Sequence, residues 1–285
     1  MALKLEMQGQ TYGPFINEYS QRDLMLFGLG CGAGFDGQTD LQYVYEKHLK
    51  VLPMFAAVPI VDGEVTRTID YGFEWGGSLH WGFDFRIHQP LTPEAVTGKL
   101  STNVLLKALY DRGEGRGCLA QHIGETVNEA GEKLFTTESW DCALYDGGFG
   151  GPRAPVDIVE IPDREPDVEI IEQVPLNQAL IYRLSGDDHP QHVDWEYARQ
   201  FGHPKPNLHG VSTAGVACRH IIQAVIPGQP ERLTRFKTRL TKSIYPGSTL
   251  KTRIWKWGDN CVHFNVQDAD NPDVFYLNYG LVEWR

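Results

Sequence analysis

The chain has 285 residues, enough for a full hydrophobic core, and its 41% apolar and 22% charged residues are ordinary for a globular protein. The formal net charge of −11 argues against nucleic acid and anionic membrane surfaces as main partners. No apolar run is as long as a membrane span, and the first residues lack the apolar core of a signal peptide.

The cysteines indicate a compartment that keeps thiols reduced. Their number, five, is odd, and they are scattered without the spacing of metal ligands. The final residues, V-E-W-R, are not a peroxisomal address. We therefore expect a cytoplasmic protein.

Two helical segments are predicted near the start of the chain. Residues 24–29 form an apolar helical face, with Arg22 and Asp23 in the first turn. The glycine-rich sequence that follows lacks the preceding strand and following helix of a nucleotide-binding loop. Residues 52–61 are apolar and of helical length, although Pro59 interrupts them.

Four runs with period-two alternation come next and predict strands of one antiparallel sheet. They span residues 79–87, 104–110, 117–127 and 133–144. The sequence G-G-F-G-G-P-R at 147–153 ends this half, so we predict a first domain over residues 1–151. The proline- and acid-rich stretch 152–175 is predicted to be an extended linker.

The second domain, residues 176–285, repeats the order of the first. An apolar helix predicted over 211–225 precedes strand-like runs at 233–245, 249–256, 261–267 and 274–283. A helix wrapped by a meander of long strands is the hotdog pattern. Two copies predict an α+β double hotdog, whose sheets join side by side and so cover their exposed edges.

The loop before the second helix carries the chemistry. Asp187 and His192 lie five residues apart, and Pro190 stiffens the segment between them. A carboxylate and an imidazole that face one water are sufficient for general acid–base catalysis. Gly210 begins the apolar helix, where an unpaired N–H can polarise a ligand oxygen. Taken alone, Asp187 is more simply a turn residue that bonds its own backbone; together, the three predict chemistry on a carbonyl compound.

The same residues carry a family resemblance. The run L-S-G-D-D-H-P-Q-H-V-D resembles the G-D-x-N-P-x-H signature of the MaoC-like, hydratase 2 family of enoyl-CoA hydratases. The later run N-L-H-G-V-S-T-A-G is similar to that family's I-L-H-G-L-C-T-x-G. Residues 19–36, 52–60, 147–153 and 235–250 also resemble the hydratase 2 part of peroxisomal multifunctional enzymes. The resemblance therefore covers nearly the whole chain.

This resemblance implies a reaction and roles. Water adds across the double bond of a trans-2-enoyl-CoA and gives the (3R)-3-hydroxyacyl-CoA. Asp187 and His192 hold the water and move its proton, while the Gly210 N–H binds the thioester oxygen. The second half carries the chemistry and the first half accommodates the acyl chain. No metal or redox cofactor is required.

Departures from the family pattern lie in the same loop. His189 stands where the family has asparagine; because an imidazole can both donate and accept, we keep His189 in the catalytic set. Gln191 and Trp195 also depart, which indicates a reshaped acyl pocket. His80 and His209 are expected to be structural.

A basic patch is expected for the phosphates of CoA. Arg235, Lys237 and Arg239 alternate along one predicted strand and therefore share a face, with Lys242 nearby. The run resembles the family's R-F-K-A-R-F-A-K. A solvated strand face is the competing interpretation. Arg219, beside the central helix, is a further candidate.

We therefore predict an (R)-specific enoyl-CoA hydratase that binds acyl-CoA with a medium, long or bulky acyl group, such as a sterol side chain. The resemblance implies a homodimer. Two alternatives stay open: a hotdog thioesterase, which would release free CoA, and a catalytically retired acyl-CoA-binding protein, in which His189 marks the lost activity.

Overall fold

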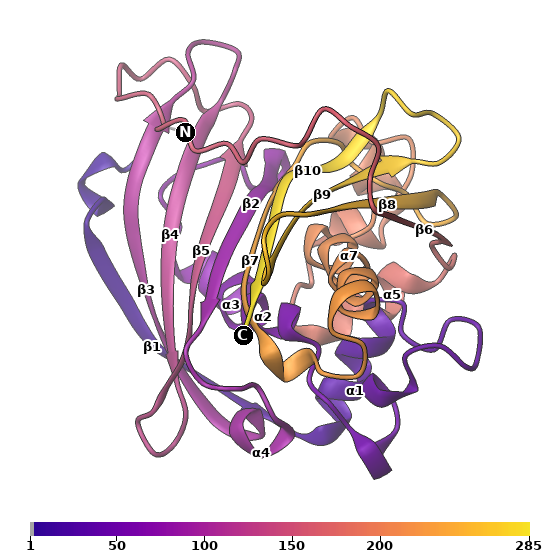
Figure 1. The fold of residues 1–285 in the computed structure, drawn as a ribbon. Coiled ribbons are helices and arrows are strands. Elements are labelled where there is room, and N and C mark those ends of the chain that lie inside the picture. Colours follow the sequence, from indigo (N-terminus) through magenta and orange to yellow (C-terminus); the bar gives the residue numbers. More distant parts are fainter. Residues whose placement is uncertain (1–2) are drawn as a thin grey trace.

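One ten-stranded antiparallel sheet organises the protein, in a computed structural model that describes residues 3–285. The strand order is β1-β3-β4-β5-β2-β7-β10-β9-β8-β6, so each half of the chain contributes five neighbouring strands (Figure 1). The first-half strands are β1 (Gln10–Tyr19), β2 (Ser78–Ile87), β3 (Gly98–Asp111), β4 (Cys118–Val127) and β5 (Lys133–Ala143). The second-half strands are β6 (Val168–Gln173), β7 (Leu233–Leu240), β8 (Thr249–Lys256), β9 (Cys261–Asp268) and β10 (Phe275–Trp284).

The two half-sheets join through β2 and β7. Phe85 and Phe236 are paired across this seam, and their buried rings stack with centroids 5.6 Å apart. At this seam β2 and β7 are hydrogen-bonded to each other, so one edge of each half-sheet is covered, as the sequence predicted. All eight predicted strands are present.

Two strands were not predicted. β1 contains Gly13 and Pro14 at a register shift against β3, which breaks the alternation that marks a strand. β6 lies inside the predicted linker 152–175 and corrects its boundary. The acidic residues of β6 made this segment look like a linker, although it pairs with β8. The irregular connector between the two halves therefore ends before Val168.

The central helix of the second half is α7 (Gly210–Val225), as predicted. Every residue from 211 to 222 is buried, because α7 lies on the concave side of the sheet and contacts β7, β8 and β10 (Figure 1). Gly215 meets Cys31 so closely that a Cβ would lie 2.3 Å from its sulfur. The absence of a side chain at Gly215 therefore allows the N-terminal segment to pack on the helix.

Within residues 3–151 no helix is comparable to α7, which corrects the expectation for residues 52–61. Those residues form the 3₁₀ helix η4 (Pro53–Ala57) and the single turn α2 (Val58–Val61), followed by α3 (Gly63–Thr68). Proline at 53 and 59 prevents a continuous helix. These short turns are buried against the first-half sheet and leave a cavity beside it.

The remaining helices are α1 (Gln21–Gly30) and several short helices of three to six residues. The predicted N-terminal helix is α1, which begins with a capping box between Ser20 and Asp23. The others are α4 (Pro93–Val96), α5 (Gln178–Tyr182), α6 (Trp195–Gln200), and the 3₁₀ helices η1 (Leu5–Met7), η2 (Leu41–Tyr43), η3 (Glu46–His48), η5 (Trp75–Gly77), η6 (Arg183–Ser185), η7 (Pro190–His192) and η8 (Pro230–Arg232). Across residues 3–285, none of the helices has the length and apolarity needed to span a membrane.

Candidate active site

Asp187 lies at the start of a tight loop between η6 and η7. Gly186 before it adopts φ +113°, and a Cβ there would meet the Asp62 carboxylate at 2.6 Å, so the turn requires glycine. The Asp187 side chain is buried, and one carboxylate oxygen accepts a hydrogen bond from the His189 N–H at 3.3 Å. Burial raises the pKa of Asp187, and nearby His80 and the His189 N–H only partly oppose it.

His192 turns its unprotonated nitrogen toward Asp187. Its Nδ1 lies 2.9 Å from the Asn207 carbonyl oxygen, which can only accept, so Nδ1 carries the proton and Nε2 has a lone pair. Nε2 lies 4.0 Å from Asp187 Oδ2. One water can contact both atoms at about 2.8 Å each. Burial lowers the pKa of His192 to about 3, which keeps the imidazole neutral.

Gly210 is the first residue of α7, so its N–H has no acceptor within the helix. A Cβ at this position would lie 2.3 Å from Leu240 Cδ2, so a larger residue fits only if the Leu240 side chain moves.

Two adjoining cavities meet at this pair. The first-half cavity is lined by Asp187, Trp75 and residues of α2 and α3 and of β2, β4 and β5. The Gly210 cavity is lined by Gly210, Leu240, Lys242 and neighbouring residues. His80, Gln191 and His192 line both. A ligand that crosses from one cavity to the other therefore passes His192.

His189, predicted to be catalytic, has both ring nitrogens engaged by backbone. Nε2 lies 3.2 Å from the Trp75 carbonyl oxygen, and Nδ1 accepts from the Gln191 N–H at 3.2 Å. Burial lowers the pKa of His189 to about 4. His189 therefore fixes the loop through these two contacts, and it lines the first-half cavity together with Asp187 and His192.

Gln191 is the site residue that the sequence undervalued. Its side-chain amide lies 3.3 Å from His192 Nε2, and its Oε1 has no hydrogen-bond partner in the described part of the chain. Its place next to His192 in the sequence H-P-Q-H was the available signal. An amide is thus present at the site, supplied by a different position from the family asparagine.

His209 supports His192 from behind. The two rings stack with centroids 3.6 Å apart and planes 25° from parallel, and His209 Nε2 lies 3.2 Å from the Asp187 carbonyl oxygen. Ligand atoms of Asp187, His192 and His209 lie within 4.8 Å of one another. Stacked rings direct their lone pairs side by side rather than toward one point, so this trio does not fit a metal ion. The structural role expected for His209 agrees with these contacts.

The predicted CoA residues separate into two groups. Lys242 is exposed at the Gly210 cavity and forms no ion pair within residues 3–285. Arg235, Lys237 and Arg239 lie on the other face of β7, away from the core side where Phe236 packs. Lys237 and Arg239 line a groove together with residues 154–158 of the connector. Each of the three basic residues already has a partner.

These partners are acidic or aromatic. Arg235 makes two hydrogen bonds to Asp84, at 2.9 and 2.7 Å. Lys237 pairs with Asp157 of the connector at 2.6 Å, and Arg239 lies over the Trp81 ring at 4.5 Å. Their binding of CoA stays a prediction.

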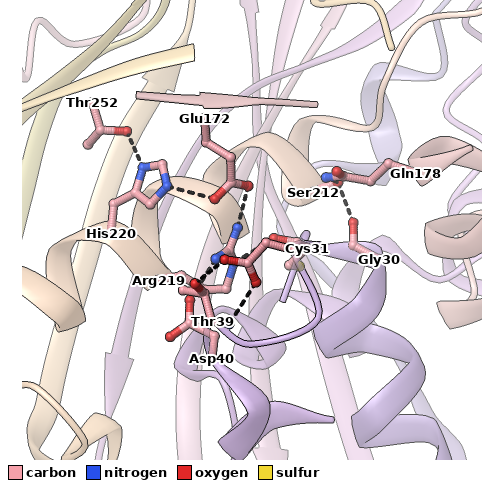
Figure 2. A network of polar contacts seen from close by, with 11 residues as sticks. Gly30, Cys31, Thr39, Asp40, Glu172, Gln178, Ser212, Arg219, His220 and Thr252 are labelled. Carbon is pink, nitrogen blue, oxygen red and sulfur yellow. Dashed lines mark hydrogen bonds and ion pairs between the residues drawn. The ribbon is translucent and has the colours of Figure 1, made fainter. Parts of the chain in front are cut away.

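The prediction that Arg219 binds CoA is wrong. Its side chain has no exposed surface and lies between two carboxylates, Asp40 at 2.6 Å and Glu172 at 2.5 Å (Figure 2). Although burial opposes the charge, the two acids raise the pKa of Arg219. A CoA phosphate cannot reach it.

The Arg219 network is structural. Glu172 also contacts His220 Nε2 at 3.1 Å, and Arg219 Nε donates to the Cys31 carbonyl (Figure 2). Arg219 therefore joins α7 to β6 and to the segment after α1. These partners lie 47 to 188 residues away along the chain, so no local sequence pattern indicates them.

The fold and the site together define a double-hotdog protein with an Asp–His pair beside a helix N-terminus. A crystal structure of a MaoC-like dehydratase from Phytophthora capsici superposes with a TM-score of 0.85 and 25% identity, covering 100% of this chain and 98% of that one. A Mycobacterium tuberculosis protein described as having a double hotdog fold, 15% identical with a TM-score of 0.62, agrees on the fold. The predicted fold class is confirmed.

Comparison of sequences gives the family. Residues 157–272 match the MaoC like domain, and residues 17–141 match the MFE-2 hydratase 2 N-terminal domain. The 3-hydroxyacyl-thioester dehydratase Y of M. tuberculosis is 35% identical, over 100% of this chain and 99% of its own length. Enoyl-CoA hydratase 2, peroxisomal, of Arabidopsis thaliana is 33% identical, over 90% of this chain and 88% of its own. The chain belongs to the MaoC-like, hydratase 2 family of enoyl-CoA hydratases.

The mouse peroxisomal multifunctional enzyme type 2 is 30% identical over 95% of this chain, which spans 37% of that enzyme's length.

Proposed function

We propose that the protein hydrates trans-2-enoyl-CoA to (3R)-3-hydroxyacyl-CoA. Family membership supports the reaction, and the observation that carries it here is the 4.0 Å separation of Asp187 Oδ2 and the unprotonated Nε2 of His192. This is the spacing at which two proton acceptors contact one water.

The residues divide the steps. The Asp187–His192 pair takes a proton from the water as its oxygen bonds to C3, and it returns a proton to C2, so the elements of water are added and nothing else is consumed. The thioester oxygen, which gains negative charge, accepts from the Gly210 N–H. A preorganised donor of this kind typically lowers the barrier by about 3–4 kcal/mol.

Gln191 orients the water with its side-chain amide. Its amide contacts His192 Nε2 and borders both cavities, so it can bond the same water. His189 acts as a positioning residue, since its ring nitrogens hold Trp75 and Gln191 in place. With Gln191 and His189 in these roles, the hydration reaction can proceed although position 189 is histidine instead of the family asparagine.

The acyl group extends into the first-half cavity, while the CoA portion leaves through the Gly210 cavity past Lys242. Several side chains of the first-half cavity are apolar, namely Ile60, Val61, Val65, Ile69 and Phe73. This lining supports a medium, long or bulky acyl group, and a sterol side chain falls within the proposal.

The proposal includes no cofactor beyond the thioester substrate, and a homodimer in the cytoplasm. All five cysteines are free thiols in the structure, which is consistent with a reduced compartment.

The test follows the loss of enoyl-thioester absorbance with crotonyl-CoA, trans-2-decenoyl-CoA and a sterol-side-chain enoyl-CoA, with chiral analysis of the product. Asp187→Asn should lower kcat about 10²–10⁴-fold. Asp188→Asn is the matched control, because the neighbouring carboxylate is half exposed and paired with Arg67. Release of free CoA would indicate a thioesterase instead, and tight acyl-CoA binding without turnover on any ester would indicate a retired binding protein.

A further inference from the structure

A second cluster of ionisable side chains faces the first-half cavity, and the hydration step does not use it. Asp141 on β5 contacts two imidazoles, His122 Nδ1 at 3.1 Å and His80 Nε2 at 3.4 Å. His80 is paired with Asp141 across the β2–β5 ladder, next to a register shift that follows it. The cluster therefore originates from three adjacent strands of the first-half sheet.

These side chains are directed into the cavity rather than to the protein surface. The side chains of Asp141 and His80 are about one fifth exposed, and both residues line the first-half cavity together with His122. Burial would raise the pKa of Asp141, but the two histidines outweigh it and lower this pKa. An ionised carboxylate thus faces the space assigned to the acyl chain.

A second, independent observation concerns Tyr71. Its side chain is only 2% exposed, it lines the same cavity, and its hydroxyl has no hydrogen-bond partner among residues 3–285. A buried hydroxyl without a partner is costly, so such groups are normally satisfied by a ligand or water. The ring itself is held by stacking on Phe73, with centroids 4.4 Å apart.

We propose that this cluster binds a hydroxyl group on the acyl chain, so that the substrate is a hydroxylated enoyl-CoA. The inference rests on the proposed function for the direction of the acyl chain. A hydroxyl can donate to the Asp141 carboxylate and accept from the Tyr71 hydroxyl through a single oxygen atom.

Other substituents fit less well. A plain alkyl chain would displace water from Asp141 and Tyr71 and replace none of its hydrogen bonds. A carbonyl would direct its lone pairs at the Asp141 carboxylate, and a second carboxylate would be repelled by it. An ammonium group would compete with His80 and His122, which already serve as donors to that carboxylate.

The experiment uses saturated ligands, which bind but cannot be hydrated. Calorimetry compares decanoyl-CoA with a series of hydroxydecanoyl-CoA esters that carry the hydroxyl at successive carbons beyond C3. At least one hydroxylated ester should bind about tenfold more tightly than decanoyl-CoA, the effect of roughly one well-made hydrogen bond. Tyr71→Phe and Asp141→Asn should each bring the two affinities close together.

Tyr43→Phe is the matched control, because Tyr43 is also buried with an unpartnered hydroxyl but lies outside both cavities. This variant should keep the tenfold preference. Equal affinity for all the esters in the wild type, or a preference that survives in both cluster variants, would overturn the inference. The proposed hydration fails separately, by absence of turnover on unsaturated esters, whatever the binding preference.

Discussion

The Asn207 carbonyl oxygen and His192 Nδ1, 2.9 Å apart, determine which nitrogen of the histidine is free to act. Asn207 precedes α7 and His192 ends η7, so one hydrogen bond couples the acid–base loop to the segment that delivers Gly210. The water site and the oxyanion site are therefore positioned together, although they come from different parts of the chain.

Replacement of His192 tests the role of its free nitrogen. His192→Gln keeps a polar group of similar length but removes the basic nitrogen, so kcat should fall about 10²–10⁴-fold with little change in substrate affinity. His203→Gln is the control, because His203 is hydrogen-bonded to Tyr245 and lines neither cavity. Steady-state kinetics on crotonyl-CoA measure both; a His192→Gln enzyme within a few fold of the wild type would contradict the assignment.

Gly210→Ala tests the oxyanion site. The new Cβ would lie 2.3 Å from Leu240 Cδ2, so Leu240 must move, and we expect kcat to fall about 10²-fold or more as the N–H loses its position. The double variant Gly210→Ala with Leu240→Ala removes the clash. If activity returns in the double variant, crowding of Leu240 caused the loss; if only thermal stability returns, the methyl group itself excludes the thioester oxygen.

The sequence predicted the parts of this site that depend on local order and missed those that depend on pairing. Asp187, His192 and Gly210 lie in one short segment, and the alternation of strands such as β8 is visible residue by residue. Arg219 looked like a candidate phosphate ligand because Asp40 and Glu172, which neutralise it, come from distant segments. No periodicity reveals such a contact.

Contacts between distant segments also explain why the helix expected over residues 52–61 in the first half is absent. Residues 52–61 are apolar enough for a helix, but the two prolines and the packing against the sheet select short turns. The cavity that results brings together His80, His122 and Asp141, which are far apart in the sequence and meet only through strand pairing. The sequence alone predicts only a structural role for His80.

The buried histidines make stability depend on pH. Burial lowers the pKa of His189 to about 4 and of His192 to about 3, whereas a histidine in the unfolded chain has a pKa of about 6.5. Between these values the unfolded chain binds more protons, so stability is full above about pH 6.5 and is lost as the pH falls toward 4. His189→Gln removes one of these titrating groups, so the slope of unfolding free energy against pH, averaged from pH 7 to 5, should fall by about 1 kcal/mol per pH unit. Denaturant titrations of both proteins from pH 7 to 5 measure it; an unchanged slope would mean that His189 is protonated in the folded protein.

Arg219→Met should destabilise the fold by about 3–5 kcal/mol, because it leaves the buried Glu172 and Asp40 carboxylates without their counter-charge. Adding Glu172→Gln to this variant should recover part of the loss. Thermal unfolding measures both variants. The KM for acyl-CoA, determined at a temperature where Arg219→Met is folded, should stay near the wild-type value, and a large rise in KM would restore the prediction that Arg219 binds CoA.

Lys242→Ala should weaken substrate binding without lowering stability, the opposite of the result expected for Arg219→Met. Lys242 is exposed beside the Gly210 cavity, so its loss should raise the KM for CoA esters several-fold without changing kcat or the melting temperature. The effect should shrink at high salt, because a solvent-exposed contact with phosphate is screened. Lys237→Ala is the matched comparison, since Lys237 lies on the other face of β7 and is paired with Asp157. If Lys237→Ala raises the KM and Lys242→Ala does not, CoA binds along the groove under the connector, and the predicted cluster of Arg235, Lys237 and Arg239 is the phosphate site.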